Sequence, residues 1–182
     1  LFNTLLAFVM LFAAALVVMN PKAKTGVIDA KAEFIITVTW PDLDPNDIDT
    51  WVQDPGGNLV WFRAREAGLM HLDRDDRGVA NDTIIVNGQT VVNPLNQEVV
   101  TIRGFAPGEY TVNLHYYESK NGQPVDVNVS VVKVNPRAEV VFYGAVKVAR
   151  KGDEATAARF TVDRAGRVGN VNTLAKKLVE RI

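Results

Sequence analysis

The chain has 182 residues, a formal net charge of −1 and no cysteine. The near-neutral charge excludes the broad basic surface of a nucleic-acid-binding protein, and the lack of cysteine excludes a disulfide framework, a thiol nucleophile and a cysteine-ligated metal. With two histidines, His71 and His115, and no recognisable nucleophile motif, the composition argues against an enzyme.

The first nineteen residues, LFNTLLAFVMLFAAALVVM, contain no charged side chain. As an α-helix they would extend roughly 28 Å, close to the hydrocarbon thickness of a bilayer. A cleaved signal peptide and a buried core helix are the alternatives, but the run has neither a basic start nor a polar face. We therefore expect residues 1–19 to form a single transmembrane helix, with the lipid bilayer as its partner.

Residues 20–31 read as a linker. Pro21 cannot continue the helix, and Lys22 and Lys24 can extend their amines to lipid headgroups. Lysines beside a membrane helix favour the cytoplasmic side, so the topology stays open at this point.

From residue 32 the apolar residues recur with a period of two, and turn residues separate the runs. This pattern predicts an antiparallel β-sandwich of eight or nine strands over residues 32–163, with a long loop at 64–81 and a hairpin around Asn87-Gly88. The segments with a strand pattern, from which the eight or nine strands of the sandwich are drawn, are 34–40, 50–53, 58–63, 83–86, 89–92, 98–103, 110–116, 125–131, 138–149 and 155–163.

Two segments at the end of this region leave alternatives. Residues 138–163 could form a separate hairpin extension, because they exceed a minimal seven-stranded sandwich. Residues 164–182 form a tail, in which Leu174, Leu178 and Ile182 have the spacing of a short helix.

The densest polar cluster lies in two acidic stretches, residues 41–49 and 71–78. Carboxylates on adjacent loops can converge on a hard cation such as calcium, which takes six to eight oxygens. The alternative is a solvated loop in which Arg74 and Arg77 pair with the acids. The candidate calcium ligands are Asp47, Asp49, Asp73, Asp75 and Asp76.

The same stretches carry a resemblance. Asp47-Ile-Asp49 enters a strand, Asp54-Pro-Gly-Gly57 forms a turn, and Leu72-Asp-Arg-Asp-Asp76 follows as a loop. This order resembles bacterial envelope β-sandwich proteins of the immunoglobulin-like type, over roughly residues 32–119. The resemblance implies an immunoglobulin-like fold in the cell envelope.

The apolar helix in turn resembles the single helix of ExbD, TolR and MotB-type motor subunits. That likeness implies an inner-membrane, single-pass protein with a periplasmic or extracellular β-domain, a homodimer or higher oligomer, and a multi-helix membrane partner. Asn3 and Thr4 are then candidates for the ion pathway. The ion-binding aspartate of those proteins has no counterpart within residues 1–19.

Together these observations predict a non-enzymatic, single-pass subunit of an oligomeric envelope complex, in its sharpest form a stator component of an ion-driven motor. The alternative is a membrane-anchored, calcium-stabilised surface module that binds a glycan or a protein. An anchored enzyme is the third and least supported reading.

Overall fold

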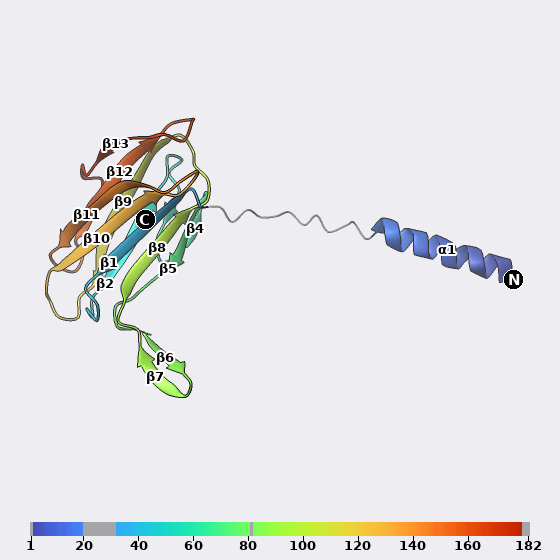
Figure 1. The fold of residues 1–182 in the computed structure, drawn as a ribbon, viewed down its shortest axis with the longest axis horizontal. Helices are drawn as coiled ribbons and strands as arrows, with labels where there is room; N and C mark the ends of the chain where they lie inside the picture. The colour runs from blue at the N-terminus through green and yellow to red at the C-terminus, as the bar shows by residue number, and fades with distance from the viewer. Residues whose placement is uncertain (1, 20–31, 81, 180–182) are drawn as a thin grey trace. The chain divides into compact units, whose positions relative to one another are not determined.

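The computed structural model describes residues 2–19, 32–80 and 82–179. The chain divides into two units, Leu1–Ala30 and Lys31–Ile182. In the first unit, helix α1 spans Phe2–Met19 (Figure 1). The side chains described in this helix, at residues 3–12, are all exposed. Within the described residues, no helix combines the length and apolar character that crossing a bilayer requires. The linker expected at residues 20–31 lies outside the described residues.

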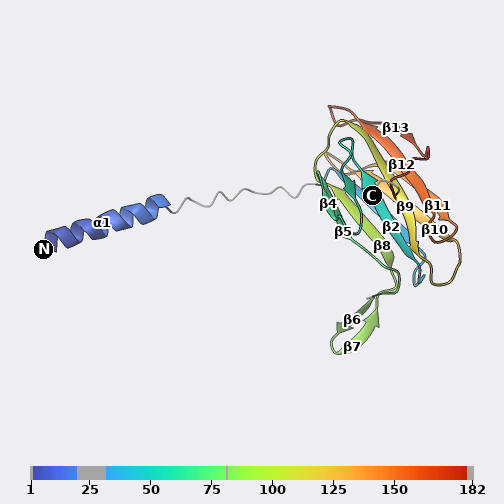
Figure 2. The ribbon, with the colours of Figure 1, turned by 180° about the vertical axis from the view of Figure 1, so that it is seen from behind.

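The second unit is mainly β, and all its strand pairs are antiparallel (Figure 1). A six-stranded sheet has the order β11 (Glu139–Val148), β10 (Val125–Lys133), β1 (Phe34–Trp40), β8 (Asn96–Ile102), β5 (Met70–Arg74) and β4 (Glu66–Ala67). A five-stranded sheet has the order β13 (Val168–Asn172), β12 (Glu154–Val162), β9 (Gly108–Glu118), β2 (Asp47–Gln53) and β3 (Leu59–Val60). Seen from behind, the strands of the second sheet lie in front (Figure 2).

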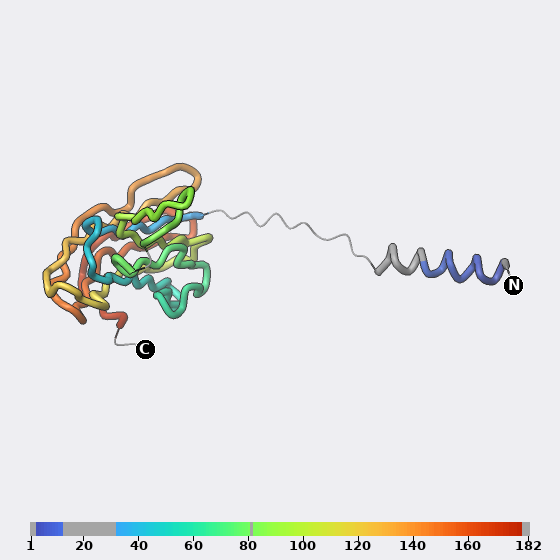
Figure 3. The backbone as a smooth tube through the Cα atoms, turned by 90° about the horizontal axis from the view of Figure 1, so that it is seen from below, coloured from blue at the N-terminus to red at the C-terminus, as the bar shows by residue number. Residues whose placement is uncertain are grey.

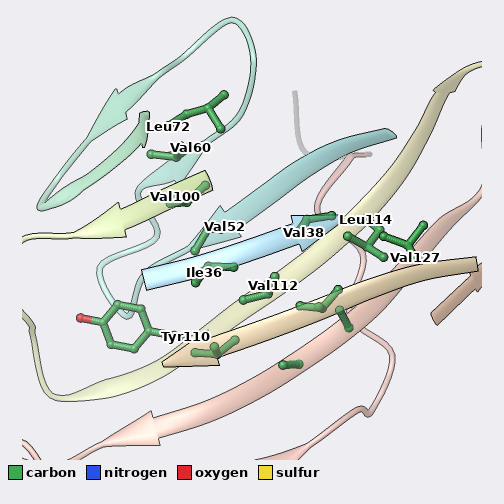
Figure 4. Close-up of a cluster of buried hydrophobic side chains, with 14 of the residues drawn as sticks. Ile36, Val38, Val52, Val60, Leu72, Val100, Tyr110, Val112, Leu114 and Val127 are labelled. Carbon is green, nitrogen blue, oxygen red and sulfur yellow. The ribbon is translucent and has the colours of Figure 1, made fainter. Parts of the chain in front are cut away.

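One hydrophobic core is shared by these two sheets. In β1 and in β8 every second side chain is buried, as expected for strands with one face on a core. The core-facing residues of β1 and β10 join those of β9 and β12 from the other sheet in one cluster. Figure 4 shows part of this cluster, with Ile36 and Val38 near Val112 and Leu114. The predicted mainly β, antiparallel fold is therefore confirmed.

Residues 138–163 belong to the two main sheets. β11 pairs with β10 in the six-stranded sheet, and β12 pairs with β9 in the five-stranded sheet. The chain thus crosses from one sheet to the other between these strands, a path that the trace in Figure 3 follows. This corrects the alternative of a separate hairpin extension: both strands bury apolar side chains in the common core.

The structure also corrects two local predictions. The expected loop at 64–81 contains β4 and β5, whose side chains alternate between the core and solvent. In the tail, residues 168–172 form β13, and residues 173–178 contain no helix. The Lys176 carbonyl accepts hydrogen bonds from Asn113 and Thr156, and its N–H donates one to the Thr156 hydroxyl, which holds this stretch against the five-stranded sheet. Ile182 lies outside the described residues.

The remaining two strands, β6 (Thr83–Val86) and β7 (Gln89–Val92), form a sheet of their own. Asn87 and Gly88 connect them with φ angles of 52° and 78°. Positive φ at both central residues is the signature of the type I′ turn, so the predicted Asn-Gly hairpin is confirmed. Figures 1 and 2 both show the hairpin projecting away from the sheets.

Candidate metal centre

Three carboxylates from three different segments converge at one place in the β unit. Asp49 lies on β2, Asp75 follows β5 directly, and Glu98 lies on β8; one oxygen of each is within 4.8 Å of the others. β2 belongs to the five-stranded sheet, whereas β5 and β8 belong to the six-stranded sheet. The cluster therefore joins the two sheets.

Glu98 is held in the cluster by the alternation of β8. Because Val100 and Ile102 face the core, Glu98 faces inward as well, and it is 1% exposed. One carboxylate oxygen, Oε2, accepts a hydrogen bond of 2.6 Å from the backbone N–H of Thr50. The other, Oε1, is buried and has no partner among the described residues. A buried, half-satisfied carboxylate is costly, so this oxygen calls for a ligand or a proton.

Asp49 and Asp75 repeat this pattern. Asp49 is 3% exposed, and its Oδ2 lacks a hydrogen-bond partner in the described part of the chain, as does Oδ1 of Asp75. His115 Nδ1 lies 3.7 Å from Asp49 Oδ2, which is too long for a hydrogen bond. Each of the three acids thus has one buried carboxylate oxygen without a partner in the described part of the chain, and one oxygen of each acid lies within 4.8 Å of the others.

A fourth acid, Asp47, lies beside the cluster on the same strand as Asp49. Its Oδ1 is buried and unpaired within the residues that the structure describes. Asp47, Asp49 and Asp75 line a pocket of about 180 Å³, whose other walls are Phe62, Arg77 and Tyr117. The pocket gives a small ligand a route from solvent to the acids.

The electrostatics of the cluster disfavour four negative charges. Burial raises the pKa of Glu98 well above its ordinary value, and the charge of Asp49 adds to this effect. Burial, reinforced by Asp49 and Asp75, raises the pKa of Asp47 to about 7. Burial also raises the pKa of Asp49, and His115 opposes that rise. Near neutral pH the cluster must therefore either retain protons or gain a cation.

The donor set fits a hard divalent cation. Every group facing the common point offers a carboxylate oxygen, and calcium takes oxygen ligands in flexible geometry, with water completing its shell. The unpaired oxygens of Asp49, Asp75 and Glu98 are the direct sign of such a site. Asp47 would be the fourth protein ligand, at the pocket mouth. Arg77, whose charge opposes the rise in the pKa of Asp47, also lines the pocket and is an exposed side chain.

Of the five acids predicted as calcium ligands, the structure brings Asp47, Asp49 and Asp75 together. Asp73 instead accepts a hydrogen bond of 2.8 Å from His71 Nδ1 and lies 3.6 Å from Arg103. Its exposed position on β5 directs its carboxylate away from the core.

Asp76 also has other partners. Its Oδ2 accepts hydrogen bonds from Arg74, at 2.7 Å, and from the backbone N–H of Gln97, at 3.2 Å. The alternative of an arginine-paired acid therefore describes Asp76, although not the cluster as a whole. The polar residues predicted for an ion pathway, Asn3 and Thr4, are exposed on α1.

Glu98 was not predicted, because it stands outside the two acidic stretches. The available signal was a charged residue in phase with Val100 and Ile102, on the side of a strand that should face the core. An acid at such a position is rare unless it has a partner, and here the partner positions come from other strands.

Aromatic side chains form a wall beside the pocket. Trp51 stacks on Trp61 with ring centroids 4.6 Å apart, and Phe62 contacts both Trp61, at 4.8 Å, and Tyr117, at 5.0 Å. Trp51 is two residues from Asp49 on β2, so the aromatic wall and the acids share this strand.

A second pocket of about 380 Å³ shares Asp75 and Arg77 with the first, and is also lined by Arg65 and Arg74. It does not resemble an anion site, because Arg74 is bonded to Asp76 and Arg65 donates to the carbonyl of Leu72. No protein-family model matches the chain, and the comparison with curated proteins gives no match either.

Proposed function

We propose that the protein is a non-enzymatic binding module, tethered to a membrane by residues 1–19, whose β unit is stabilised by calcium. The observation that carries this proposal is the convergence of Asp49, Asp75 and Glu98 from the two sheets, each with one buried carboxylate oxygen that has no partner among the described residues. With Asp47 they supply the ligands, and the cation removes their mutual repulsion.

The tether is supported by the chemistry of the first unit. Residues 1–19 carry no charge, and the described helix side chains from Leu5 to Phe12 include seven large apolar groups more than half exposed to solvent. Such a surface is stable only against lipid or protein. A location outside the cytoplasm is the natural one for this proposal, because calcium sites of low affinity suffice in extracellular modules.

The stator form of the function stays a prediction. It needs an ion-binding acid in the membrane helix, and the residues from Leu1 to Met19 contain none. We favour the tethered module with a protein or glycan target, because the acid cluster of the β unit supports a calcium-stabilised domain. Subunit counting on the complex extracted in mild detergent separates the two: two copies inside a ring of a multi-helix partner would favour the stator.

An immunoglobulin-like classification is likewise a proposal. It is supported by Tyr110, near the start of β9, whose hydroxyl accepts a hydrogen bond from Ala106 N–H and donates one to the Ala106 carbonyl. A buried tyrosine bonded to backbone a few residues upstream is typical of such sandwiches. β10 lies beside β1, and after β11 the chain crosses to β12 in the other sheet. This arrangement departs from the minimal seven-stranded sandwich.

Thermal unfolding of the full chain in detergent micelles tests the calcium site. We expect calcium at 100 times its Kd to add about 2.7 kcal/mol to the free energy of unfolding, compared with the chelated protein. For a domain of this size that is a rise of roughly 5–10 °C in Tm.

Glu98→Gln makes the test specific. Glutamine keeps an oxygen for the Thr50 N–H but removes a buried charge next to Asp49, so Tm in chelator should not fall, whereas most of the calcium-induced rise should be lost. Asp126→Asn is the matched control, because Asp126 is 68% exposed and, among the residues that the structure describes, its one ion pair is with Lys147, 3.4 Å away. An unchanged Tm on adding calcium, or a full calcium response in Glu98→Gln, would refute the site.

A further inference from the structure

The β6–β7 hairpin exposes apolar side chains without packing them on the rest of its unit. All eight strand residues are exposed, including Ile85 at 77%, Val92 at 53% and Ile84 at 51%. Monomeric proteins rarely keep a contiguous apolar surface of this kind in water. The hairpin is therefore a candidate contact surface for another molecule.

Both faces of the ribbon are apolar. The register pairs Ile84 with Val91 on one face, and Ile85 with Thr90 on the other. An isolated two-stranded ribbon is marginally stable in water, and further strands are needed to make it robust. Within the described residues β6 and β7 pair only with each other, so each keeps an outer edge for another strand.

Charged residues and proline, two common protections of an exposed edge, are missing from both strands of the hairpin. From Thr83 to Gln97 there is no charged residue, and neither strand contains proline or lysine. Natural sheets normally use such residues to prevent pairing with another chain. Because the edge carries no charge, it does not repel the same edge of a second copy. The unpaired backbone groups of two identical hairpins can therefore hydrogen-bond to each other.

A lipid occupant fits less well. A hairpin that enters a bilayer does so tip first, and the tip here is Asn87-Gly88-Gln89, which is polar. The apolar residues lie along the sides of the ribbon instead, where a neighbouring strand or sheet would cover them.

We propose that the β6–β7 hairpin is the site at which a second copy of the chain binds. The two hairpins pair edge to edge across a two-fold axis and form a four-stranded antiparallel sheet. Such an isologous contact uses the same surface on both copies and closes on itself. It is independent of the calcium site, because none of the four acids lies in the hairpin.

The lack of native cysteine allows a direct test, since a single introduced cysteine reports only its own position. The full chain carrying Thr90→Cys is kept in excess detergent micelles and treated with a short bis-maleimide. Lys151→Cys, in the exposed turn between β11 and β12, is the matched control for copies that merely share a micelle. We expect several-fold more cross-linked dimer from Thr90→Cys than from Lys151→Cys.

Disruption completes the experiment. Adding Ile85→Lys to Thr90→Cys should lower the yield to the level of the control, because it places a charged side chain on the exposed apolar face of the hairpin in both copies. Adding Val140→Lys, at an exposed valine of β11, should leave it unchanged. Equal yields at positions 90 and 151, or persistence of the dimer with Ile85→Lys, would overturn the proposal. A second result would also overturn it. If the Thr90→Cys chain does not cross-link, and the fluorescence emission of a bimane attached to the introduced cysteine shifts to the blue when neutral lipid vesicles are added, lipid is the occupant.

Discussion

At the scale of single residues, Asp47 shows how the acid cluster governs stability. In the chelated protein its pKa is about 7, raised by burial and by Asp49 and Asp75, against an ordinary value of 3.8. Between these two values the folded state binds more protons than the unfolded state, so this residue lowers stability as the pH rises. A bound cation would remove that penalty.

The Asp47→Asn variant isolates this titration. In chelator, the Tm of the variant minus that of the wild type should increase as the pH rises from about 4 to about 7, and then level off, because only the wild type loses a proton in that window. Melts at matched ionic strength measure this difference. A difference that is constant across the window would show that Asp47 titrates normally.

The sequence predicted three of these acids because they alternate along short segments, which places Asp47 and Asp49 on one side of a strand. It did not separate Asp75 from Asp73 and Asp76, since that choice depends on a register shift between β5 and β8 after Leu72. Such a bulge has no reliable signature in a single sequence.

At the scale of elements, the C-terminal tail shows a role that helical spacing concealed. Leu178 is fully buried, yet lies outside the main core cluster. Glu154 accepts hydrogen bonds from the backbone N–H groups of Leu178, at 2.6 Å, and Val179, at 3.2 Å. The tail is therefore fixed on the five-stranded sheet by a buried leucine and a set of backbone bonds.

Truncation of Leu178 measures this contribution. Leu178→Ala should lower the free energy of unfolding by about 2–3 kcal/mol, because it leaves a cavity at a buried site. Leu174→Ala is the matched control: Leu174 is 68% exposed, and its loss should change stability by less than about 0.5 kcal/mol. Chemical denaturation of both variants gives the comparison, and equal effects would show that the tail does not depend on Leu178.

Strand prediction succeeded where alternation was long and clean, as in β1 and in the valines of β10. It failed for β4 and β5, because these are short and contain Glu66, His71 and Asp73, which resemble a solvated loop. β5 owes its strand conformation to pairing with β8, a contact between distant segments that composition does not encode, and β4 in turn pairs with β5.

At the scale of the whole β unit, the acid cluster adds a polar connection between two sheets that share one apolar core. Its ligands come from β2 in one sheet, and from β8 and the end of β5 in the other. A cation at this point would oppose any opening in which the sheets separate at this side. Calcium should therefore make the two sheets unfold together, in addition to stabilising the acids that bind it.

Hydrogen exchange tests this cooperative effect. We expect calcium to slow amide exchange in β2 and in β8 together, since both must separate before the cation is released. β11, at the far edge of the six-stranded sheet, serves as the internal reference and should respond only through global unfolding. Protection confined to β2 would mean that the cation, if bound, does not bridge the sheets.

The stacked indoles of Trp51 and Trp61 give this molecule an optical consequence. Two indoles with centroids 4.6 Å apart and planes inclined by 24° are close enough to couple their electronic transitions, and we expect a paired, opposite-signed circular dichroism band. Trp40 is buried elsewhere and is hydrogen-bonded to the Asn46 carbonyl, so it does not share in this signal. Any rearrangement of β2 at the acids would alter the angle between the two rings, and the intrinsic chromophores would register it without a label.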